Sequence, residues 1–196
     1  MPAATAETGL LSACAAIVVA HSEHDSATLV ALGGRVGFAS VTPFSQATLA
    51  DDPAHHMPFF LVHYGLGNAA KKLLLSRLRS APSNNVRFAP VVLFIPDGPS
   101  EEILFYIGMG FDDVICLPEN SHILASRLST QIGQEHMFVE TRTYLGPDRR
   151  RMELPGQTHP DRAGDYEHTK LTIVRRPGIG VQVMRRQLFL KAAHKP

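Results

Sequence analysis

Five short apolar runs, each followed by a segment with a helical pattern, constrain the fold of the first 135 residues more than any other feature. The first run, AAIVVA, is apolar at every position, which is typical of a strand covered by helices on both faces. Strands that alternate with helices in this way predict βαβ units, in which neighbouring strands are parallel. The expected strands are residues 15–20, 38–41, 59–62, 90–95 and 114–117.

Helical patterns fill the gaps between these strands. In residues 68–80, Ala70, Leu74 and Leu78 recur at four-residue steps, which places them on one face of a helix. Helices are expected to begin at the capping residues Asp25 and Asn68, at Ser121, and in residues 45–50 and 100–108. Five βα units in this length predict an α/β protein of the flavodoxin-like (βα)5 class, with a parallel sheet in the order 2-1-3-4-5.

The charged residues divide the chain into two parts. Residues 1–135 contain seven Lys and Arg against twelve Asp and Glu, a net charge of −5. Residues 136–196 contain twelve against six, a net charge of +6. The expected organisation is a flexible N-terminus of residues 1–12, an α/β domain of residues 13–135, and an arginine-rich, partly irregular extension of residues 136–196.

Two segments of the extension carry different patterns. Residues 144–167 lack hydrophobic periodicity and are predicted to form a loop or to be disordered when alone. Residues 168–192 are compatible with two structures. One is a β-hairpin around Pro177 and Gly178, and the other is a strand followed by a short amphipathic helix.

Several classes of protein need residues that this chain lacks. No apolar run approaches the roughly 20 residues that span a bilayer, and acidic Glu7 precedes the apolar residues 10–20, unlike the basic start of a secretory signal. Cys14 and Cys116 form no disulfide or metal-binding pattern, which is typical of buried thiols in a reducing compartment. The sequence contains no Ser/His/Asp set, glycine-rich phosphate loop or paired-carboxylate motif. It therefore predicts a cytoplasmic protein that is not an enzyme and has no resident cofactor.

Residues 89–118, APVVLFIPDGPSEEILFYIGMGFDDVICLP, carry a more specific signal. This stretch resembles receiver domains of bacterial response regulators of the chemotaxis type. In that family a Pro-led apolar strand ends in Thr, a helix ends in Gly-Ala, and Asp-Asp leads into a strand that ends in Lys-Pro. The first 90 residues match the family by the order of their elements more than by letters. Asp112 and Asp113 are expected to cap and solubilise the turn before the fifth strand, without a part in catalysis.

The resemblance implies a phosphoryl-transfer site at the strand ends, and this chain lacks the groups for it. A receiver needs a carboxylate nucleophile after the third strand and acidic Mg²⁺ ligands after the first. It also needs a hydroxyl after the fourth strand and a lysine after the fifth. The matching positions hold Ala20, His21, His63, Ile95 and Leu117. The resemblance therefore implies a pseudo-receiver that is not phosphorylated on aspartate.

Histidines replace two of the missing groups. His21 and His63 are expected at the carboxyl ends of neighbouring strands, where open α/β sheets bind ligands. Imidazoles together with a carboxylate can hold Zn²⁺ or a similar metal. The alternative is a set of surface histidines with one partly buried ring. The weak metal candidates are His21, His24 and His63, with Asp25, Asp97, His55 and His56 nearby.

The segment TYLGPDRRR ends in three arginines after a Gly-Pro-Asp turn. It resembles the extension of certain alphaproteobacterial single-domain receivers, and related proteins with arginine-rich tails bind cyclic di-GMP. Guanidinium groups bind phosphates and the Hoogsteen edge of guanine in bidentate fashion and stack on bases. In the alternative, Asp148 pairs with a neighbouring arginine and the run is a solvated surface. The ligand-binding candidates are Asp148, Arg149, Arg150, Arg151, Arg175, Arg176, Arg185 and Arg186.

The leading hypothesis is a non-catalytic signalling adaptor of the two-component type that acts by protein–protein interaction. The resemblance implies a partner such as a histidine kinase or a chemotaxis protein, bound by the face around the fourth helix and fifth strand. Candidate contacts on that face are Ile103, Phe105, Tyr106 and Met109, wherever they are exposed. The alternatives are a cyclic di-GMP effector and a metal-binding protein, and a homodimer stays open. DNA is a weaker partner because no helix-turn-helix pattern is present, and residues 185–195 offer only a small apolar face to a membrane.

Overall fold

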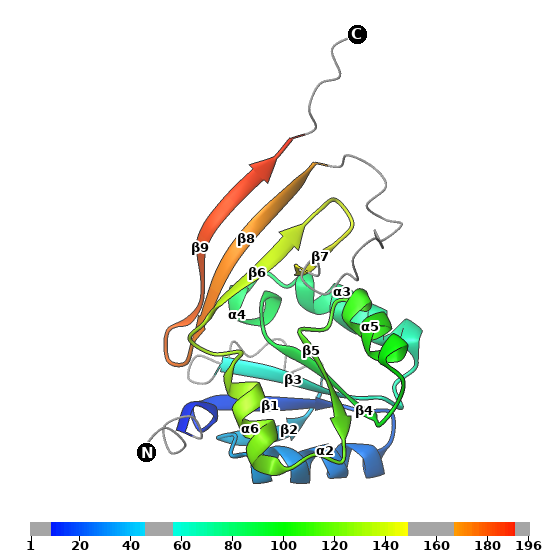
Figure 1. Cartoon of the computed structure of the whole chain (residues 1–196). Coiled ribbons are helices and arrows are strands. Elements are labelled where there is room, and N and C mark those ends of the chain that lie inside the picture. The colour runs from blue at the N-terminus through cyan, green and yellow to red at the C-terminus, as the bar shows by residue number, and fades with distance from the viewer. Residues whose placement is uncertain (1–8, 46–56, 149–166, 191–196) are drawn as a thin grey trace.

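The computed structural model describes residues 9–45, 57–148 and 167–190. Its α/β domain is built on a five-stranded parallel sheet in the order β2-β1-β3-β4-β5 (Figure 1). This is the order of the flavodoxin-like class, so the predicted fold is confirmed. Each strand lies within two residues of its predicted position. The strands are β1 (Cys14–Val19), β2 (Ser40–Pro43), β3 (Met57–His63), β4 (Val91–Pro96) and β5 (Asp113–Leu117).

The helices follow the strands as expected, but two of the predicted caps are wrong. The side chain of Ser22, not of Asp25, accepts the capping hydrogen bond of the first of them, from the backbone N of Asp25 at 3.1 Å. Gly67 occupies the cap position before Asn68 and makes no side-chain bond. Asp25 and Asn68 are already helical, whereas a cap needs extended backbone. The helices are α2 (Glu23–Val36), α3 (Asn68–Arg79), α4 (Asn84–Arg87), α5 (Ser100–Met109) and α6 (Ser121–Ser129). Most of the helix predicted at residues 45–50 lies outside the described residues.

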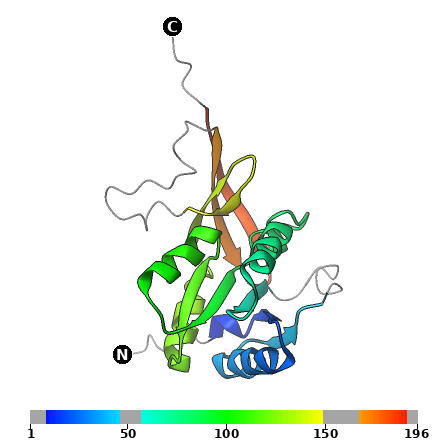
Figure 2. The same cartoon turned by 90° about the vertical axis from the view of Figure 1, so that its right-hand side faces the viewer.

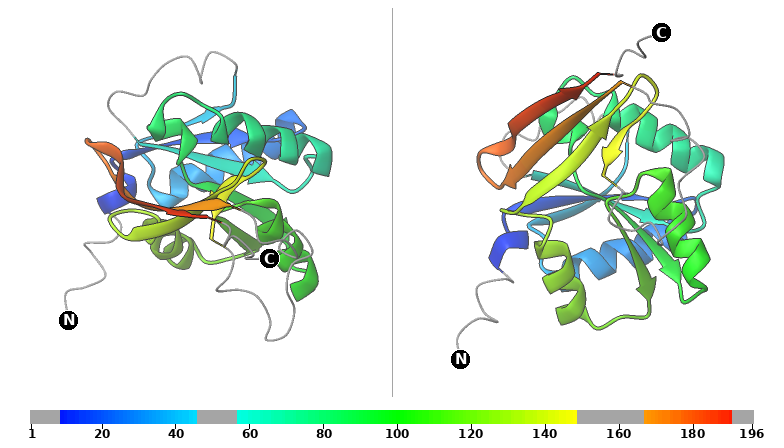
Figure 3. Two further views of the ribbon diagram at one scale, coloured as in Figure 1. Left: turned by 90° about the horizontal axis from the view of Figure 1, so that it is seen from above. Right: turned by 45° about the horizontal axis from the view of Figure 1, so that its top comes forward.

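Helices cover both faces of the parallel sheet (Figures 1 and 3). Ala16 and Val18 of β1 belong to a core with α2 and α6, while Ile17 and Val19 belong to a core with α3 and α5. Successive side chains of a strand point to opposite faces, so a strand with two covered faces must be apolar throughout. This explains the uninterrupted apolar runs of the sequence.

The described part of the extension forms a second sheet, which is antiparallel and has the order β7-β6-β8-β9. Of the two structures proposed for residues 168–192, the hairpin is correct and the strand followed by a helix is wrong. Gly178 and Gly180 take positive φ angles of 78° and 95° at its turn, a conformation that favours glycine. Leu145–Pro147 forms a short strand inside the segment predicted as loop. The strands are β6 (Glu135–Glu140), β7 (Leu145–Pro147), β8 (His168–Arg176) and β9 (Gly180–Phe189).

The second sheet packs on the α/β domain at the amino ends of β4 and β5 (Figure 1). Phe88, which precedes β4, forms a small apolar core with Phe138, Leu171, Ile173 and Val181 of the extension. The carboxyl ends of the parallel strands, where the candidate site was expected, lie at the opposite end of the domain. No helix among the described residues is long and apolar enough to cross a membrane.

Candidate functional site

The carboxyl ends of the parallel strands hold the five side chains that the sequence resemblance matched to the phosphorylation groups of a receiver. The strand registers place these ends side by side, since His63 pairs with Phe94 and Ile95 pairs with Cys116. Hydrocarbon side chains can neither accept a phosphoryl group nor hold Mg²⁺. The five positions carry half-buried Ala20, exposed His21, His63 with a 12% exposed side chain, buried Ile95 and half-buried Leu117.

His63 is the most specifically placed of these residues. Its Nδ1 lies 3.4 Å from Oδ2 of Asp25 and 3.3 Å from the backbone N of Gly65. An unprotonated Nδ1 accepts the Gly65 N–H, whereas a protonated Nδ1 donates to Asp25. Burial lowers the pKa of His63, and the charges of Lys71 and His24 add to this, while the Asp25 carboxylate opposes it. The neutral ring is therefore the favoured form at neutral pH.

Lys71, in the first turn of α3, is a polar residue near this edge that the sequence reading missed. It is 1% exposed, and its Nζ donates to the carbonyl oxygen of Tyr64 at 2.8 Å. The Nζ also lies 4.6 Å from the centre of the Tyr106 ring. Burial lowers the pKa of Lys71. Helical periodicity could have predicted that Lys71 is buried, since it places Lys71 on the same face as Leu74 and Leu78. The ammonium group supports the connection between β3 and α3.

The weak metal candidates His21, His24 and His63 do not form a metal-binding group in the structure. His21 and His24 are exposed. Among the residues that the structure describes, no three His, Cys, Asp or Glu side chains form a group that could hold a metal ion. His55 and His56 lie outside the described residues. What remains of the cluster at this edge is the contact between His63 and Asp25.

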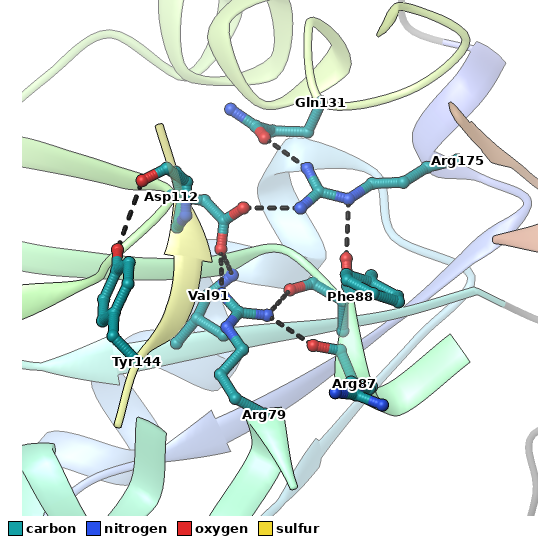
Figure 4. A network of polar contacts seen from close by, with 10 residues as sticks. Arg79, Arg87, Phe88, Val91, Asp112, Gln131, Tyr144 and Arg175 are labelled. Atoms are coloured by element: carbon teal, nitrogen blue, oxygen red, sulfur yellow. Dashed lines mark hydrogen bonds and ion pairs between the residues drawn. The ribbon is translucent and has the colours of Figure 1, made fainter. Parts of the chain in front are cut away.

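A second polar site lies where the extension meets the α/β domain (Figure 4). Asp112, directly before β5, is its centre. One carboxylate oxygen lies 2.6 Å from Nη2 of Arg79, and the other lies 2.5 Å from Nη2 of Arg175. The backbone N of Val91 also donates to this carboxylate, at 2.9 Å. Burial raises the pKa of Asp112, but the charges of Arg175 and Arg79 outweigh it, so the pKa lies below its usual value.

Arg175, on β8, is fully buried. Its Nε donates to the carbonyl oxygen of Phe88 at 2.8 Å, and its Nη1 donates to Oε1 of Gln131 at 2.6 Å. The prediction that Arg175 binds a ligand is therefore wrong in this structure, because its guanidinium has no access to solvent. The alternation of side chains along β8 could have predicted this burial, since it places Arg175 on the same face as the buried Leu171 and Ile173.

The two neighbouring aspartates before and in β5 have different roles. The expectation that Asp112 solubilises a turn is wrong, because its side chain is 3% exposed and joins two arginines. Asp113 lies nearer the surface, and its carboxylate contacts Arg127 at 2.6 Å. Only Asp113 therefore has the local, partly solvated role expected of the pair.

The other arginine candidates are spread along the extension. Arg176, next to the hairpin turn, is exposed and donates to Oε1 of Gln182 at 3.1 Å. Arg185 and Arg186 lie in the half of β9 away from the turn and are also exposed. Half-buried Asp148 follows β7, and its backbone N donates to the Met137 carbonyl oxygen at 2.8 Å. Arg149, Arg150 and Arg151 lie outside the described residues.

A cavity of about 520 Å³ opens beside the junction between the two sheets. His136 lines it, and the buried Nε2 of this ring has no hydrogen-bond partner within the described ranges. Burial and the nearby Arg175 lower the pKa of His136 to about 4. The ring is therefore neutral at neutral pH. The lining residues are Asp112, Gln131, Glu135, His136, Met137, Phe138, Pro147, Asp148 and Lys170.

Comparisons with known proteins give similarity in fold only. The sequence matches no family model and no curated protein. A response regulator in red light signalling of R. palustris is 16% identical, with a TM-score of 0.43 over 60% of this chain and 90% of that one. Full-length FixJ from B. japonicum is 19% identical, with a TM-score of 0.43 over 59% of this chain and 56% of that one. A response regulator receiver domain from Rhodospirillum rubrum is 19% identical, with a TM-score of 0.40 over 58% and 90%. The fold assignment depends on the observed strand order.

Proposed function

We propose that this chain is a signalling adaptor of the two-component type that binds a partner protein and is not itself phosphorylated. The proposal depends on one observation. The sheet has the 2-1-3-4-5 order, but the side chains at its strand ends are not those that phosphoryl transfer requires. His63, Ile95 and Leu117 stand where a receiver holds its nucleophile, hydroxyl and lysine. Without these groups the fold keeps its surface but loses the chemistry of phosphoryl transfer.

The surface of α5 supports a role in protein binding. This helix flanks β5, which is an edge strand of the sheet. Leu104 is 39% exposed and Phe105 is 51% exposed. Large apolar side chains on the surface, aromatic ones above all, are typical of interface cores. Of the four contacts predicted on this face, Phe105 is exposed, Ile103 and Met109 are half-buried, and Tyr106 is buried at 7%.

The position of the second sheet is compatible with this surface being used. Its apolar contact with the α/β domain is made through Phe88, and its polar contact through Arg79 and Asp112. These residues lie at the amino ends of β4 and β5, and the apolar core between the two sheets includes no residue of α5 among those described. A partner can therefore approach α5 without displacing this core.

Labelling with acetyl phosphate and Mg²⁺ tests the absence of phosphorylation. We expect no stoichiometric incorporation of phosphate, because neither the nucleophile nor the metal ligands are present at the strand ends. An active receiver domain in the same assay serves as the positive control. Stoichiometric phosphate on any residue of this chain would contradict the proposal.

A pull-down from the native cell tests partner binding through α5. We expect Phe105→Glu to lose the bound partner, because a charge in an apolar contact must be desolvated. Leu73→Glu is the matched control, since Leu73 is 53% exposed on the different helix α3. The same partners on both variants and on the unmodified chain would show that α5 is not the binding surface.

Cyclic di-GMP binding remains the alternative, with fewer candidate residues. Arg175 is buried, which leaves Arg176, Arg185 and Arg186 on the described surface. Titration calorimetry with cyclic di-GMP can compare the chain with a variant in which Arg149, Arg150 and Arg151 are replaced by Ala. Absence of heat from both proteins would exclude this alternative.

A further inference from the structure

Strand β9 is the edge strand of the second sheet, and most of it is exposed. It pairs with β8 on one side, and no other strand among the described residues pairs with its second side. From Val183 to Phe189 every residue is exposed. Figure 2 shows the far ends of β8 and β9 extending away from the α/β domain. A long exposed edge of this kind presents unpaired N–H and C=O groups, which can pair with a further strand.

The side chains of this edge combine apolar and positively charged groups. Val183, Met184 and Leu188 are 40%, 53% and 59% exposed. Arg185 and Arg186 lie between them, and the Arg186 side chain is 68% exposed. The register pairs Arg185 with Thr172 and Arg186 with Leu171, so the two guanidiniums leave the sheet on opposite faces. Each face of the edge therefore carries one arginine, and exposed apolar side chains lie before and after the two arginines.

We propose that β9 is a docking edge for an extended, acidic segment of a partner protein, which joins the second sheet as a fifth strand. Main-chain hydrogen bonds along β9 provide the affinity in strand addition, and side chains at alternate positions provide the specificity. Two adjacent carboxylates in the segment can reach Arg185 and Arg186 on the two faces. Apolar residues on either side of them can cover Val183 and Leu188.

Charge complementarity favours an acidic segment over a second copy of this chain. Antiparallel pairing of the exposed residues 183–189 with themselves, across a two-fold axis, places Arg186 opposite its own copy. Like charges directly opposite each other in a sheet are destabilising. Glu140 contacts Arg186 at 2.9 Å but also contacts Arg87 at 2.8 Å, so its charge is shared. Among the described residues, no ion pair is made by Arg185, whose side chain is exposed.

This inference does not depend on the proposed function. The docking edge belongs to the extension, whereas the surface proposed for the adaptor role lies on α5. Phe105→Glu is therefore expected to leave docking at β9 unchanged. Failure of one proposal is distinguishable from failure of the other by comparing the two sets of variants.

Binding of designed peptides to the full chain tests the proposal. The probe is a fluorescent, capped peptide Thr-Val-Thr-Glu-Glu-Val-Thr-Val, and its control has Lys-Lys in place of Glu-Glu. We expect fluorescence anisotropy to show binding of the acidic peptide, and binding of the basic peptide weaker by at least about tenfold. The double variant Arg185→Glu with Arg186→Glu should reverse this preference. Arg142→Glu, which changes an exposed arginine outside β9, should not.

Amide hydrogen exchange separates strand addition from a contact between charges alone. We expect the acidic peptide to slow exchange in residues 185–189, because new main-chain hydrogen bonds protect outward-facing amides. Binding without this protection would overturn strand addition, and equal binding of both peptides would overturn the charge argument. Absence of binding by either peptide would overturn the proposal. A dimer in sedimentation that is lost in the Arg185 and Arg186 double variant would identify a second copy as the occupant instead.

Discussion

The two ends of the parallel sheet use ionisable groups in opposite ways. At the carboxyl ends, His63 is neutral at neutral pH and Ile95 and Leu117 are hydrocarbons, so the edge holds little of the charge that phosphoryl transfer needs. At the amino ends, the Asp112 carboxylate is buried between the guanidiniums of Arg79 and Arg175. The difference indicates that the buried ion pairs of Asp112 serve the attachment of the second sheet to the domain.

The same difference predicts how each end responds to mutation. Charges removed from water depend on their partners, and loss of one partner leaves an uncompensated buried charge. The five positions matched to receiver groups at the carboxyl ends carry partly buried, exposed or apolar side chains without a buried ion pair. We therefore expect large effects at the junction between the sheets and small effects at the strand ends.

Replacement of Asp112 by Ala should have the largest effect. It leaves Arg79 and Arg175 buried without a counter-charge, and we expect a loss of about 3–5 kcal/mol in the free energy of unfolding. Asp113→Ala is the matched control, because its partner Arg127 is 46% exposed, and it should cost less than about 1 kcal/mol. Urea unfolding of both variants measures the difference. Equal losses would show that the junction is no more important than a surface ion pair.

Acidification should weaken the folded state through His136. Its pKa in the folded chain is about 4, below its ordinary value of 6.5, so the unfolded chain binds more protons between these values. The contribution of this ring is therefore fully present above pH 6.5 and is lost as the pH falls towards 4. The loss is on the order of 3 kcal/mol at most. His63 acts in the same direction, because its pKa is also lowered.

Unfolding measured at several pH values between 7.5 and 4 tests this prediction. His136→Gln should flatten the dependence on pH, because the replacement does not titrate. His122→Gln is the control, since His122 is exposed on α6. An unchanged slope in His136→Gln would show that other groups cause the acid sensitivity.

Alanine at either of two glycines in the hairpin turn should have a smaller effect on stability. The two variants together test the contact between the hairpin and α4. A Cβ at Gly180 would clash with the side chain of Asn85, whose Oδ1 accepts the backbone N–H of Val181 at 2.8 Å. A Cβ at Gly178 would meet nothing within 4 Å. Both positions have positive φ, so backbone strain should lower the free energy of unfolding of both alanine variants by about 1 kcal/mol. Gly180→Ala should lose about 1–2 kcal/mol more, because it also displaces the Asn85 hydrogen bond.

Thermal unfolding of the two glycine variants gives this difference directly. The backbone cost is common to both, so the additional loss reports the contact between α4 and β9. Equal stability of the two variants would mean that Asn85 contributes little to the attachment of the hairpin.

Local patterns in the sequence predicted the parallel sheet well. Strands covered on both faces need continuous apolar runs, and such runs predicted each of the five strands to within two residues. The extension was less predictable, because its strands are separated by a long segment and are half-exposed. Their pairing is long-range and leaves a weaker local pattern.

The junction could not be predicted from local patterns. Arg79 lies 33 residues before Asp112, and Arg175 lies 63 residues after it. Only the fold brings these three side chains together. The available signals were indirect: each arginine falls on the apolar face of its own helix or strand. At the strand ends, by contrast, the position of His63 followed from the end of a single apolar run.

Introducing a carboxylate at the strand ends should have the smallest effect. His63→Asp places a possible nucleophile at the end of β3, but Ala20, Ile95 and Leu117 still cannot supply the other groups. The new carboxylate would also lie near Asp25, which opposes its ionisation. We expect no phosphate from acetyl phosphate and Mg²⁺, and a change in the free energy of unfolding of about 1 kcal/mol, because the His63 side chain is only partly buried and has no charged partner that is fully buried. Stoichiometric labelling of His63→Asp would show that other side chains, such as that of Lys71, replace the missing groups. The lack of phosphorylation chemistry at the carboxyl ends would then depend on His63 alone.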